Sequence, residues 1–477
     1  MANLESLPRG LPRSQSGSVP RPPPYLAELP FEILTEIVQK LSWKDILRVR
    51  QTCNHLAAIT TALSIWRAIA QEELGRTSSR TPGLFLERPL DGYNADELEH
   101  LILRWKSAEI GWTKDDGSPA RERKLDMVDV CSCHLVKGGR WLLVSTWSGS
   151  IVYYDLDEEK PTQRELITVA GRTGSVMSVD IDQSSPTLTF NLALGTAEYP
   201  PDRPKEYIVE VWRVHLGDSA ESRFSTLSAE LLASFHPEPQ NKVKKLSILG
   251  DFVAFCVDLR PSSSFYTIIV NWTDSSYPRW LKHSFIHVFD GVRLLPQHQV
   301  LLRQGCYVRL FNFISFWHLA TLPTDLRVAD VEPFWEAQLD ATRDETIHEP
   351  LIYDDCSRLV FATTTAVFGL TILHPLTRVA SDSPGTFVKL CDIPQGTFVA
   401  AIPAHSLCYS AFQDFSDVTL IHHPWPDEDG HYSGSPTVIK KTLTHWGKFC
   451  PTVDIQTGRV ITGTYPIGIA EFSLLRH

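Results

Sequence analysis

The chain has 477 residues, a length that favours two or three parts over one ordinary domain. Its 45 basic and 56 acidic residues give a net charge of −11, which argues against a general nucleic-acid binder and against a protein of anionic membranes. Its apolar runs fall short of the roughly eighteen residues of a membrane-spanning helix, and the arginines near its N-terminus precede no apolar segment. We therefore expect neither a transmembrane helix nor a secretory signal.

The cysteines agree with a reducing compartment. There are 9 of them, an odd number, and they are scattered among strand-like apolar residues rather than spaced as a disulfide framework. Buried, reduced thiols are the usual state of cysteines in such a pattern. The sequence thus predicts an intracellular protein, located in the cytoplasm, the nucleus or both.

The first segment, residues 1–24, is rich in Pro, Ser, Arg and Gly and contains few aromatic or β-branched residues. Such a composition cannot bury enough apolar surface to offset the entropy lost on ordering. We expect a flexible tail here, followed by a small helical domain over residues 25–75.

A helix is expected to begin near Leu29 and Pro30, because proline at a first helical position loses no hydrogen bond. Glu32 in the first turn suits the helix dipole. The apolar residues that follow recur at the spacing of one broad helical face. They are Ile33, Leu34, Ile37, Val38 and Leu41.

Two more helices are expected before the end of this domain. Ser42, with Asp45 three residues later, forms a capping-box-like start for the second helix. The third helix carries apolar residues from Leu56 to Ile69. A unit of about forty residues lies near the lower limit for a self-sufficient core, so we expect its surplus apolar surface to pack on a partner or on the next domain.

This stretch resembles an F-box. The family's pattern has a Leu-Pro opening, a Glu-Ile-Leu step, a hydrophobic pair, a closing Leu, an Asp-Ile-Leu step, a Cys and a late Leu-x-x-Trp. The matching positions are Leu29-Pro30, Glu32-Ile33-Leu34, Ile37-Val38, Leu41, Asp45-Ile46-Leu47, Cys53 and Leu63-Ser64-Ile65-Trp66. One departure is His55-Leu56, where the family often has a Trp-Arg pair.

The resemblance implies that this helical domain docks onto a Skp-type adaptor, and through it onto a cullin-RING ubiquitin ligase. The adaptor-binding residues carried over from the pattern are Leu29, Pro30, Ile33, Leu34, Ile37, Leu41, Leu47 and Trp66. Because interfaces draw most of their binding energy from a few buried anchors, we expect that role for Leu34, Ile37, Leu47 and Trp66. The alternative is an ordinary helical subdomain that binds no adaptor.

Residues 76–123 are expected to form a linker with one helix over about residues 94–109. Asn94 can cap this helix, with Glu97 at its third position. The apolar positions that follow at helical spacing are Leu98, Leu101, Ile102 and Trp105. We expect this helix to pack on both neighbouring domains and to fix their orientation, which a Gly/Ser linker would not do.

The residue pattern changes at about Lys124, and residues 124–477 are expected to be all-β. Short apolar or alternating runs rich in Val, Ile, Phe, Tyr and Trp alternate there with turn residues. Three stretches share one plan of a turn residue, an arginine, an apolar strand and a closing threonine. They are Gly139–Thr146, Ser357–Thr363 and Gly458–Thr464.

Each of these stretches precedes a second strand, and weaker strand pairs lie in residues 188–214, 252–272, 291–313 (Gly291–Arg303 as one strand) and 398–422. The seven pairs recur at intervals of roughly forty to sixty residues, the spacing of four-stranded propeller blades. The region resembles a degenerate WD-repeat β-propeller. Its Gly-His opening is absent, and Tyr154-Asp155 and Trp212-Arg213 replace the Trp-Asp signature. We predict seven blades, with six blades or an irregular β-array as alternatives.

The fold class is thus multidomain, with a small all-α F-box-like domain and a linker helix before the all-β region. No catalytic motif is found, and we expect neither an enzyme nor a cofactor or metal site. Cys131, Cys133 and His134 lack a second pair for tetrahedral zinc, so we expect core strand residues there. The acidic run Asp155–Glu159 is expected to be a solvated turn rather than a calcium site. The polar loop around residues 422–431 is expected to contact a partner, with catalysis or metal binding as the alternatives.

The function expected from these features is that of a substrate receptor in a Skp-cullin-F-box ubiquitin ligase. The helical domain would bind the adaptor, and the propeller would recruit an unidentified protein for ubiquitination, with the transfer chemistry supplied by other subunits. Substrate contacts are expected in the longer insertions, residues 199–206, 215–228, 323–350 and 424–436. The alternatives are an adaptor-bound scaffold without a degradation substrate, and a propeller hydrolase or sugar-binding protein whose helical N-terminus is incidental.

Overall fold

The structure is a computed structural model. The residues it describes are 26, 29–75, 84–113, 119–127, 129–169, 171–198, 206–217, 225–237, 242–259, 264–274, 281–285, 289–304, 306–313, 332–339, 350–353, 355–363, 365–374, 383–393, 404–405, 409–413, 417–423, 425, 437–442, 452–454, 456–462 and 467–473. Contacts divide the chain into two compact units, Met1–Ile69 and Ala70–His477, which we call the helical unit and the β unit. None of the helices described here combines the length and apolar character that a membrane crossing requires.

The helical unit is built from short helices, and the last of them continues into the β unit. The helices are α1 (Phe31–Val38), α2 (Trp43–Arg50), α3 (Asn54–Thr60) and α4 (Leu63–Gly75). One side of each helix in the unit is buried in a shared apolar core. The fully or nearly fully buried apolar side chains are Leu34, Val38, Ile46, Leu56, Ile59, Ile65, Trp66 and Ile69.

Two details of the helical unit differ from the sequence prediction. Pro30 lies just before the first helical residue, as the N-cap, and its carbonyl accepts the Leu34 N–H at 3.0 Å. The expected third helix is broken at Thr61 and Ala62 into α3 and α4. The break follows from Thr60, whose carbonyl accepts side-chain N–H groups from other parts of the unit instead of serving only a continuous helix.

The β unit contains seven four-stranded antiparallel sheets in the part of the chain that the structure describes. The first four are β2 (Val130–Leu135), β3 (Trp141–Thr146), β4 (Ile151–Asp155), β5 (Arg164–Ile167); β6 (Arg172–Ile181), β7 (Thr189–Glu198), β8 (Glu206–Gly217), β9 (Thr226–Phe235); β10 (Lys242–Leu249), β11 (Phe252–Leu259), β12 (Ser264–Asn271), β13 (Leu281–Phe285); and β14 (Phe289–Leu295), β15 (Gln299–Gln304), β16 (Tyr307–Asn312), β17 (Trp335–Gln338).

The remaining three sheets complete the unit. They are β18 (Leu351–Ile352), β19 (Cys356–Ala362), β20 (Ala366–Leu373), β21 (Gly385–Asp392); β22 (Ala404–His405), β23 (Tyr409–Gln413), β24 (Asp417–His422), β25 (Thr437–Thr442); and β26 (Thr452–Asp454), β27 (Arg459–Thr462), β28 (Ile467–Glu471) with β1 (Arg121–Leu125). The last sheet joins the first strand of the unit to its last three strands, and its β1 pairs directly with β28.

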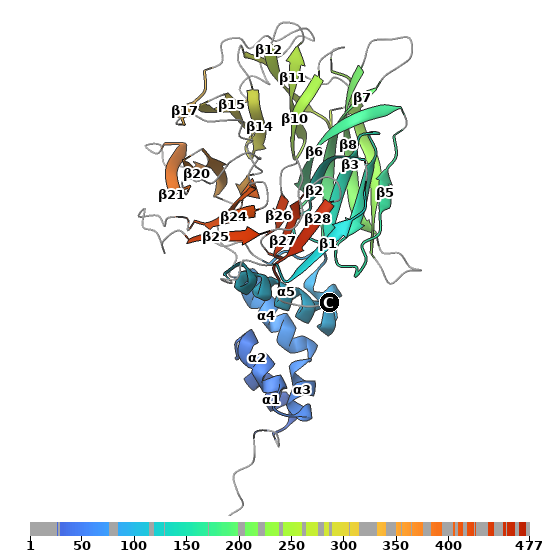
Figure 1. Cartoon of the computed structure of the whole chain (residues 1–477), viewed down its shortest axis with the longest axis vertical. Helices are drawn as coiled ribbons and strands as arrows, with labels where there is room; N and C mark the ends of the chain where they lie inside the picture. Colours follow the sequence, from blue (N-terminus) through green and yellow to red (C-terminus); the bar gives the residue numbers. More distant parts are fainter. Residues whose placement is uncertain are drawn as a thin grey trace, which may run out of the picture. The chain divides into compact units, whose positions relative to one another are not determined.

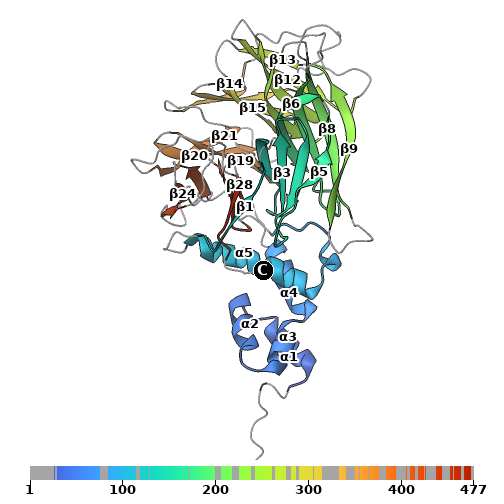
Figure 2. The ribbon, with the colours of Figure 1, turned by 45° about the vertical axis from the view of Figure 1, so that its right-hand side comes forward.

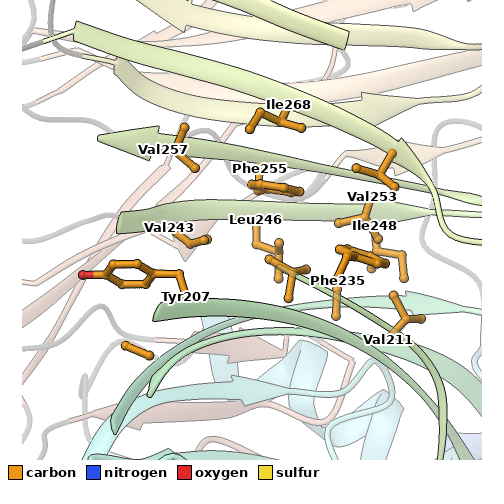
Figure 3. Close-up of a cluster of buried hydrophobic side chains, with 14 residues drawn as sticks. Tyr207, Val211, Phe235, Val243, Leu246, Ile248, Val253, Phe255, Val257 and Ile268 are labelled. Carbon is orange, nitrogen blue, oxygen red and sulfur yellow. The ribbon is translucent and has the colours of Figure 1, made fainter. Parts of the chain in front are cut away.

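Successive sheets bury apolar clusters between them, and this face-to-face packing orders them as a ring (Figures 1 and 2). Figure 3 shows one such cluster, in which Val243 and Ile248 of β10 meet Val211 of β8 and Phe235 of β9. The sheet that holds β1 packs on the sheet that holds β2, and β26 contacts β22, so the ring closes. The fold is a β-propeller, which confirms the prediction of an all-β region, and the seven predicted strand pairs fall in seven different sheets.

One predicted strand is wrong. The apolar run Gly291–Arg303 forms a hairpin, β14 and β15, rather than a single strand. The turn lies at Gln297 and His298, which both adopt positive φ values of 60° and 61°. These backbone angles suit a tight hairpin turn, but neither residue is a glycine or an asparagine, so the turn signal in the sequence is limited to Pro296 just before them.

A single long helix precedes β1. This helix, α5 (Ala95–Thr113), follows a short 3₁₀ helix, Leu90–Gly92, and has the predicted cap. The Asn94 N–H donates to Glu97 Oε2 at 2.9 Å, and the Glu97 N–H donates to Asn94 Oδ1 at 2.9 Å. The helix extends beyond the expected end near residue 109, and Ile102, Ala108 and Trp112 are buried within the β unit.

Candidate protein-interaction site

One face of α1 is apolar and exposed. Ile33 and Ile37 retain 45% and 39% of their accessible surface, and we call these two residues the apolar strip; Phe31, the first residue of the helix, is 49% exposed on another side of it. Ile33 and Ile37 are one helical turn apart and therefore neighbours on the surface, while Leu34 and Val38 of the same helix point into the core. Apolar residues of the kind usually found in a core therefore lie on a surface that the described part of the unit does not cover.

The start of α2 is fixed by its own polar residues. The Asp45 N–H donates to Ser42 Oγ at 3.3 Å, and the Ser42 hydroxyl donates to Asp45 Oδ2 at 2.7 Å, which confirms the predicted cap. Hydrogen bonds from Ser42 and from Arg48 hold the pKa of Asp45 below its usual range. The carboxylate therefore stays charged at the helix N-terminus, where the dipole favours it.

A buried polar knot joins α2, α3 and α4. The Trp66 indole N–H donates to the Thr60 carbonyl oxygen at 3.0 Å, and Arg50 Nη2 donates to the same oxygen at 3.2 Å. Arg50 Nε also donates to Thr60 Oγ1 at 3.0 Å, and its guanidinium lies 5.9 Å from the centre of the Trp66 ring. These contacts fix the bend between α3 and α4 and satisfy the polar groups that the break exposes.

The residues predicted to bind an adaptor do not share one environment. Ile33 and Ile37 are exposed on the apolar strip, and Pro30 is exposed beside it. The half-buried members are Leu29, Leu41 and Leu47. Leu34 and Trp66 are fully buried, so as their side chains lie they support the fold, and a partner that meets this surface touches Ile33 and Ile37 first. Adaptor binding by any of the eight residues stays a prediction.

Trp66 should therefore act through the stability of the helical unit. We expect Trp66→Phe to destabilise it by about 1–3 kcal/mol, because the Thr60 carbonyl loses a buried donor and the ring leaves a small void. Hydrogen exchange of the α3 and α4 amides in the full chain measures this effect. Trp43→Phe is the control, since Trp43 is only half-buried at the start of α2. Equal loss of protection in both variants would contradict the assignment.

The acidic run Asp155–Glu159 is not a simple solvated turn, so the prediction of a solvated turn is wrong. Asp155 is buried, and Arg140 grips both of its carboxylate oxygens, from Nε at 3.0 Å and from Nη2 at 2.7 Å. The third nitrogen of Arg140 donates to Glu87 at 2.8 Å. The carboxylates of the turn pair with arginines from four other places in the β unit: Arg140 before β3, Arg104 of α5, Arg164 of β5 and Arg459 of β27.

Asp157 is the centre of this ion cluster. It accepts hydrogen bonds from Arg104 of α5 and, at 2.8 Å, from Arg459 of β27. Burial alone would raise the pKa of Asp157, but the positive charges of Arg104, Arg459 and Arg140 outweigh it and hold that pKa well below its usual range. The cluster thus connects α5, the sheet of β2 to β5 and the sheet that holds β27.

The residues that the structure describes form no cluster suited to a metal ion. Among them, no group of three or more His, Cys, Asp or Glu side chains could hold a metal ion. Cys131, Cys133 and His134 lie on β2 and are half-buried. The predicted contact insertions 323–350 and 424–436 lie largely outside the described residues. Residues 199–205 of the first insertion and most of the polar loop around residues 422–431 lie outside them as well.

The family comparison bears on the helical part of the chain. Residues 26–72 match the F-box-like family model. The match covers α1, α2, α3 and most of α4, and we refer to these residues as the F-box-like region. No curated protein matches the sequence of the chain.

The structural comparison bears on the β unit. The chain is similar to the β-propeller domain of Cps50 (Swd1) from Myceliophteria thermophila, with 9% identity and a TM-score of 0.47, over 74% of this chain and 99% of that one. It is also similar to the WD40 domain of SCAP from fission yeast, with 7% identity and a TM-score of 0.38, over 72% of this chain and 85% of that one. The WD40 repeats of RRP9 match with 11% identity and a TM-score of 0.44, over 74% and 98%. These likenesses concern the fold.

Proposed function

We propose that the protein is a substrate receptor of a Skp-cullin-F-box ubiquitin ligase. In this proposal the F-box-like region binds a Skp-type adaptor, and the β unit recruits the protein to be ubiquitinated. The chain itself is not an enzyme in this proposal, because ubiquitin transfer is supplied by other subunits and is promoted by proximity.

The observation that carries the proposal is the apolar strip within the F-box-like region. A helix that exposes Ile33 and Ile37 side by side leaves apolar area in water that a partner can bury. α1 packs on α3, and the hydrogen bonds of Arg50, Thr60 and Trp66 join α3 to α2 and α4. A surface that is ordered before binding loses little entropy when a partner binds it. Two exposed isoleucines on a rigid helix are thus candidate anchors for an adaptor groove.

The test is co-purification of the full chain with a Skp-type adaptor. We expect the wild type to bind and the double variant Ile33→Glu, Ile37→Glu to lose at least tenfold in affinity, because two carboxylates would be buried without partners. Both side chains are exposed, so the substitutions should leave the fold intact, which circular dichroism checks.

The matched control is the double variant Leu231→Glu, Leu232→Glu on β9. These leucines are exposed to 46% and 41%, and the change in charge is the same, but they lie in the β unit. Adaptor binding should persist in this control. The proposal fails if the wild type does not bind, or if the isoleucine variant binds as well as the leucine variant. If the wild type binds, depletion of the chain from cells distinguishes a receptor from a scaffold. Accumulation of a bound partner protein on depletion indicates a substrate receptor.

A further inference from the structure

Trp147 is the most exposed of the large apolar side chains in the described part of the β unit, at 52%. It lies in the turn between β3 and β4, next to the start of β6. A half-exposed tryptophan is uncommon on a surface that has no use for it, because the ring buries a large apolar area when it is covered.

The turn that carries Trp147 is held by the backbone and not by the indole. The Trp147 N–H donates to the Asp129 carbonyl at 3.3 Å, and the Trp147 carbonyl accepts the Gly174 N–H at 3.0 Å. Gly149 closes the turn with a φ of +86°, a conformation that favours glycine. The fold therefore fixes the position of Trp147 without needing its side chain.

The indole is also placed by a second glycine. Gly174 has a φ of +51°, and a Cβ on it would lie 3.7 Å and 3.8 Å from two carbons of the Trp147 ring. One edge of the ring thus lies near a residue that has no side chain, and Trp147 as a whole keeps 52% of its accessible surface. An exposed aromatic side chain on a turn that the backbone holds in place has the properties of an interface anchor.

The charge beside the ring is negative. Asp129 is exposed, and its carboxylate accepts the Ser148 N–H at 3.3 Å. Asp126 is exposed in the same connection between β1 and β2. The neighbouring cation, Arg172, is directed at the buried Glu210, 2.7 Å away, so its charge is offset. An exposed aromatic ring on a turn that also holds a carboxylate, Asp129, favours a cation.

We propose that Trp147 and Asp129 bind a lysine or arginine side chain in a basic segment of the protein that the β unit recruits. This proposal rests on the proposed function, since it names the chemistry of the recruited partner. The cation would lie over the indole, and the Asp129 carboxylate would offset its charge.

The test uses the full chain and four labelled twelve-residue peptides, each with four repeats of Gly-Ser-Lys, Gly-Ser-Arg, Gly-Ser-Gln or Gly-Ser-Glu. Fluorescence anisotropy at low salt should show tighter binding of the Lys or Arg peptide than of the Gln peptide. Trp147→Ala and Asp129→Asn should each weaken that binding by about two- to fivefold. Trp147→Phe should retain part of it, because a phenyl ring is a weaker partner for a cation.

Leu231→Ala, at another exposed apolar position, is the control and should bind like the wild type. The proposal is overturned if the basic peptides show no advantage, if Trp147→Ala binds them unchanged, or if Leu231→Ala weakens them equally. Binding that depends on Trp147 but not on Asp129 or peptide charge would indicate an apolar segment and would also overturn it. Adaptor binding is measured on the same variants and should be unchanged. If the wild type itself does not bind the adaptor, it is the proposed function that fails, and not the proposal for Trp147.

Discussion

Replacing Arg459 with methionine is expected to lower the free energy of unfolding by about 3–5 kcal/mol. Arg459 is fully buried at the start of β27 and donates to Glu471 at 2.9 Å, to Asp157 at 2.8 Å and to two backbone carbonyls. Methionine fills most of the space but leaves these carboxylates in the interior with one arginine fewer. Removing one member of a buried ionic network costs more than the network itself contributes, because the remaining charges are left without compensation.

Urea denaturation of the full chain, followed by tryptophan fluorescence, measures this loss. Arg309→Met is the matched control. Arg309 pairs with Glu336 at 2.6 Å, but both side chains are partly exposed, so this pair should contribute less than about 1 kcal/mol. Similar midpoints for the two variants would show that the cluster around Asp157 is no more important than a surface pair.

The second large effect is expected for Gly111→Ala in α5. A Cβ at Gly111 would overlap the carbonyl oxygen of Phe472 and lie 2.7 Å from its carbonyl carbon. Because that neighbour is backbone, the helix itself must move away, which would part the stacked rings of Trp112 and Phe472, now 4.6 Å apart. We expect a loss of about 3 kcal/mol or more in the stability of the β unit, the upper end of the cost of overpacking.

Gly75→Ala makes this expectation specific. Gly75 is the last residue of α4, and a Cβ there would meet nothing within 4 Å. Alanine favours the helix over glycine, so this variant should be neutral or up to about 1 kcal/mol more stable. Thermal unfolding of both variants provides the comparison. If the two alanine variants melt together, α5 does not need the close approach at Gly111.

The helices show what local chemistry can predict. Both caps, at Ser42 and at Asn94, were predictable because a capping side chain and its partner are three residues apart. The break at Thr61 was not predictable, since it depends on Arg50 and Trp66 reaching the Thr60 carbonyl from other helices. Apolar spacing alone continued the helix across that point.

The β unit shows the same limit. The recurring arginine of Gly139–Thr146 and Gly458–Thr464 was visible in the sequence, but its acidic partners come from other strands and, for Arg459, from another sheet. The acidic run was therefore assigned to solvent, although Asp155 is buried. Strand pairs were found because they are adjacent in sequence, and the ion cluster was missed because it is not.

The candidate site was predicted as a set of residue types, and the structure divides that set by exposure. Periodicity placed Ile33, Leu34 and Ile37 on one broad apolar face, but it could not say where the core ends and the surface begins. That boundary depends on how α3 packs on α1. Trp147 carried no signal in the sequence, because a tryptophan among strand residues is usually buried.

The pairing of β1 with β28 also sets the order in which the chain can fold. Six of the seven sheets are made of strands that follow one another, so each can form soon after synthesis. Arg123 of β1 must wait for Glu471, 348 residues later, to make its 2.6 Å contact. Until then the edges of β1 and of the newest strand have no partner and are open to pairing with other chains. We therefore expect ring closure to be slow and sensitive to aggregation, because it pairs strands that are far apart in the sequence.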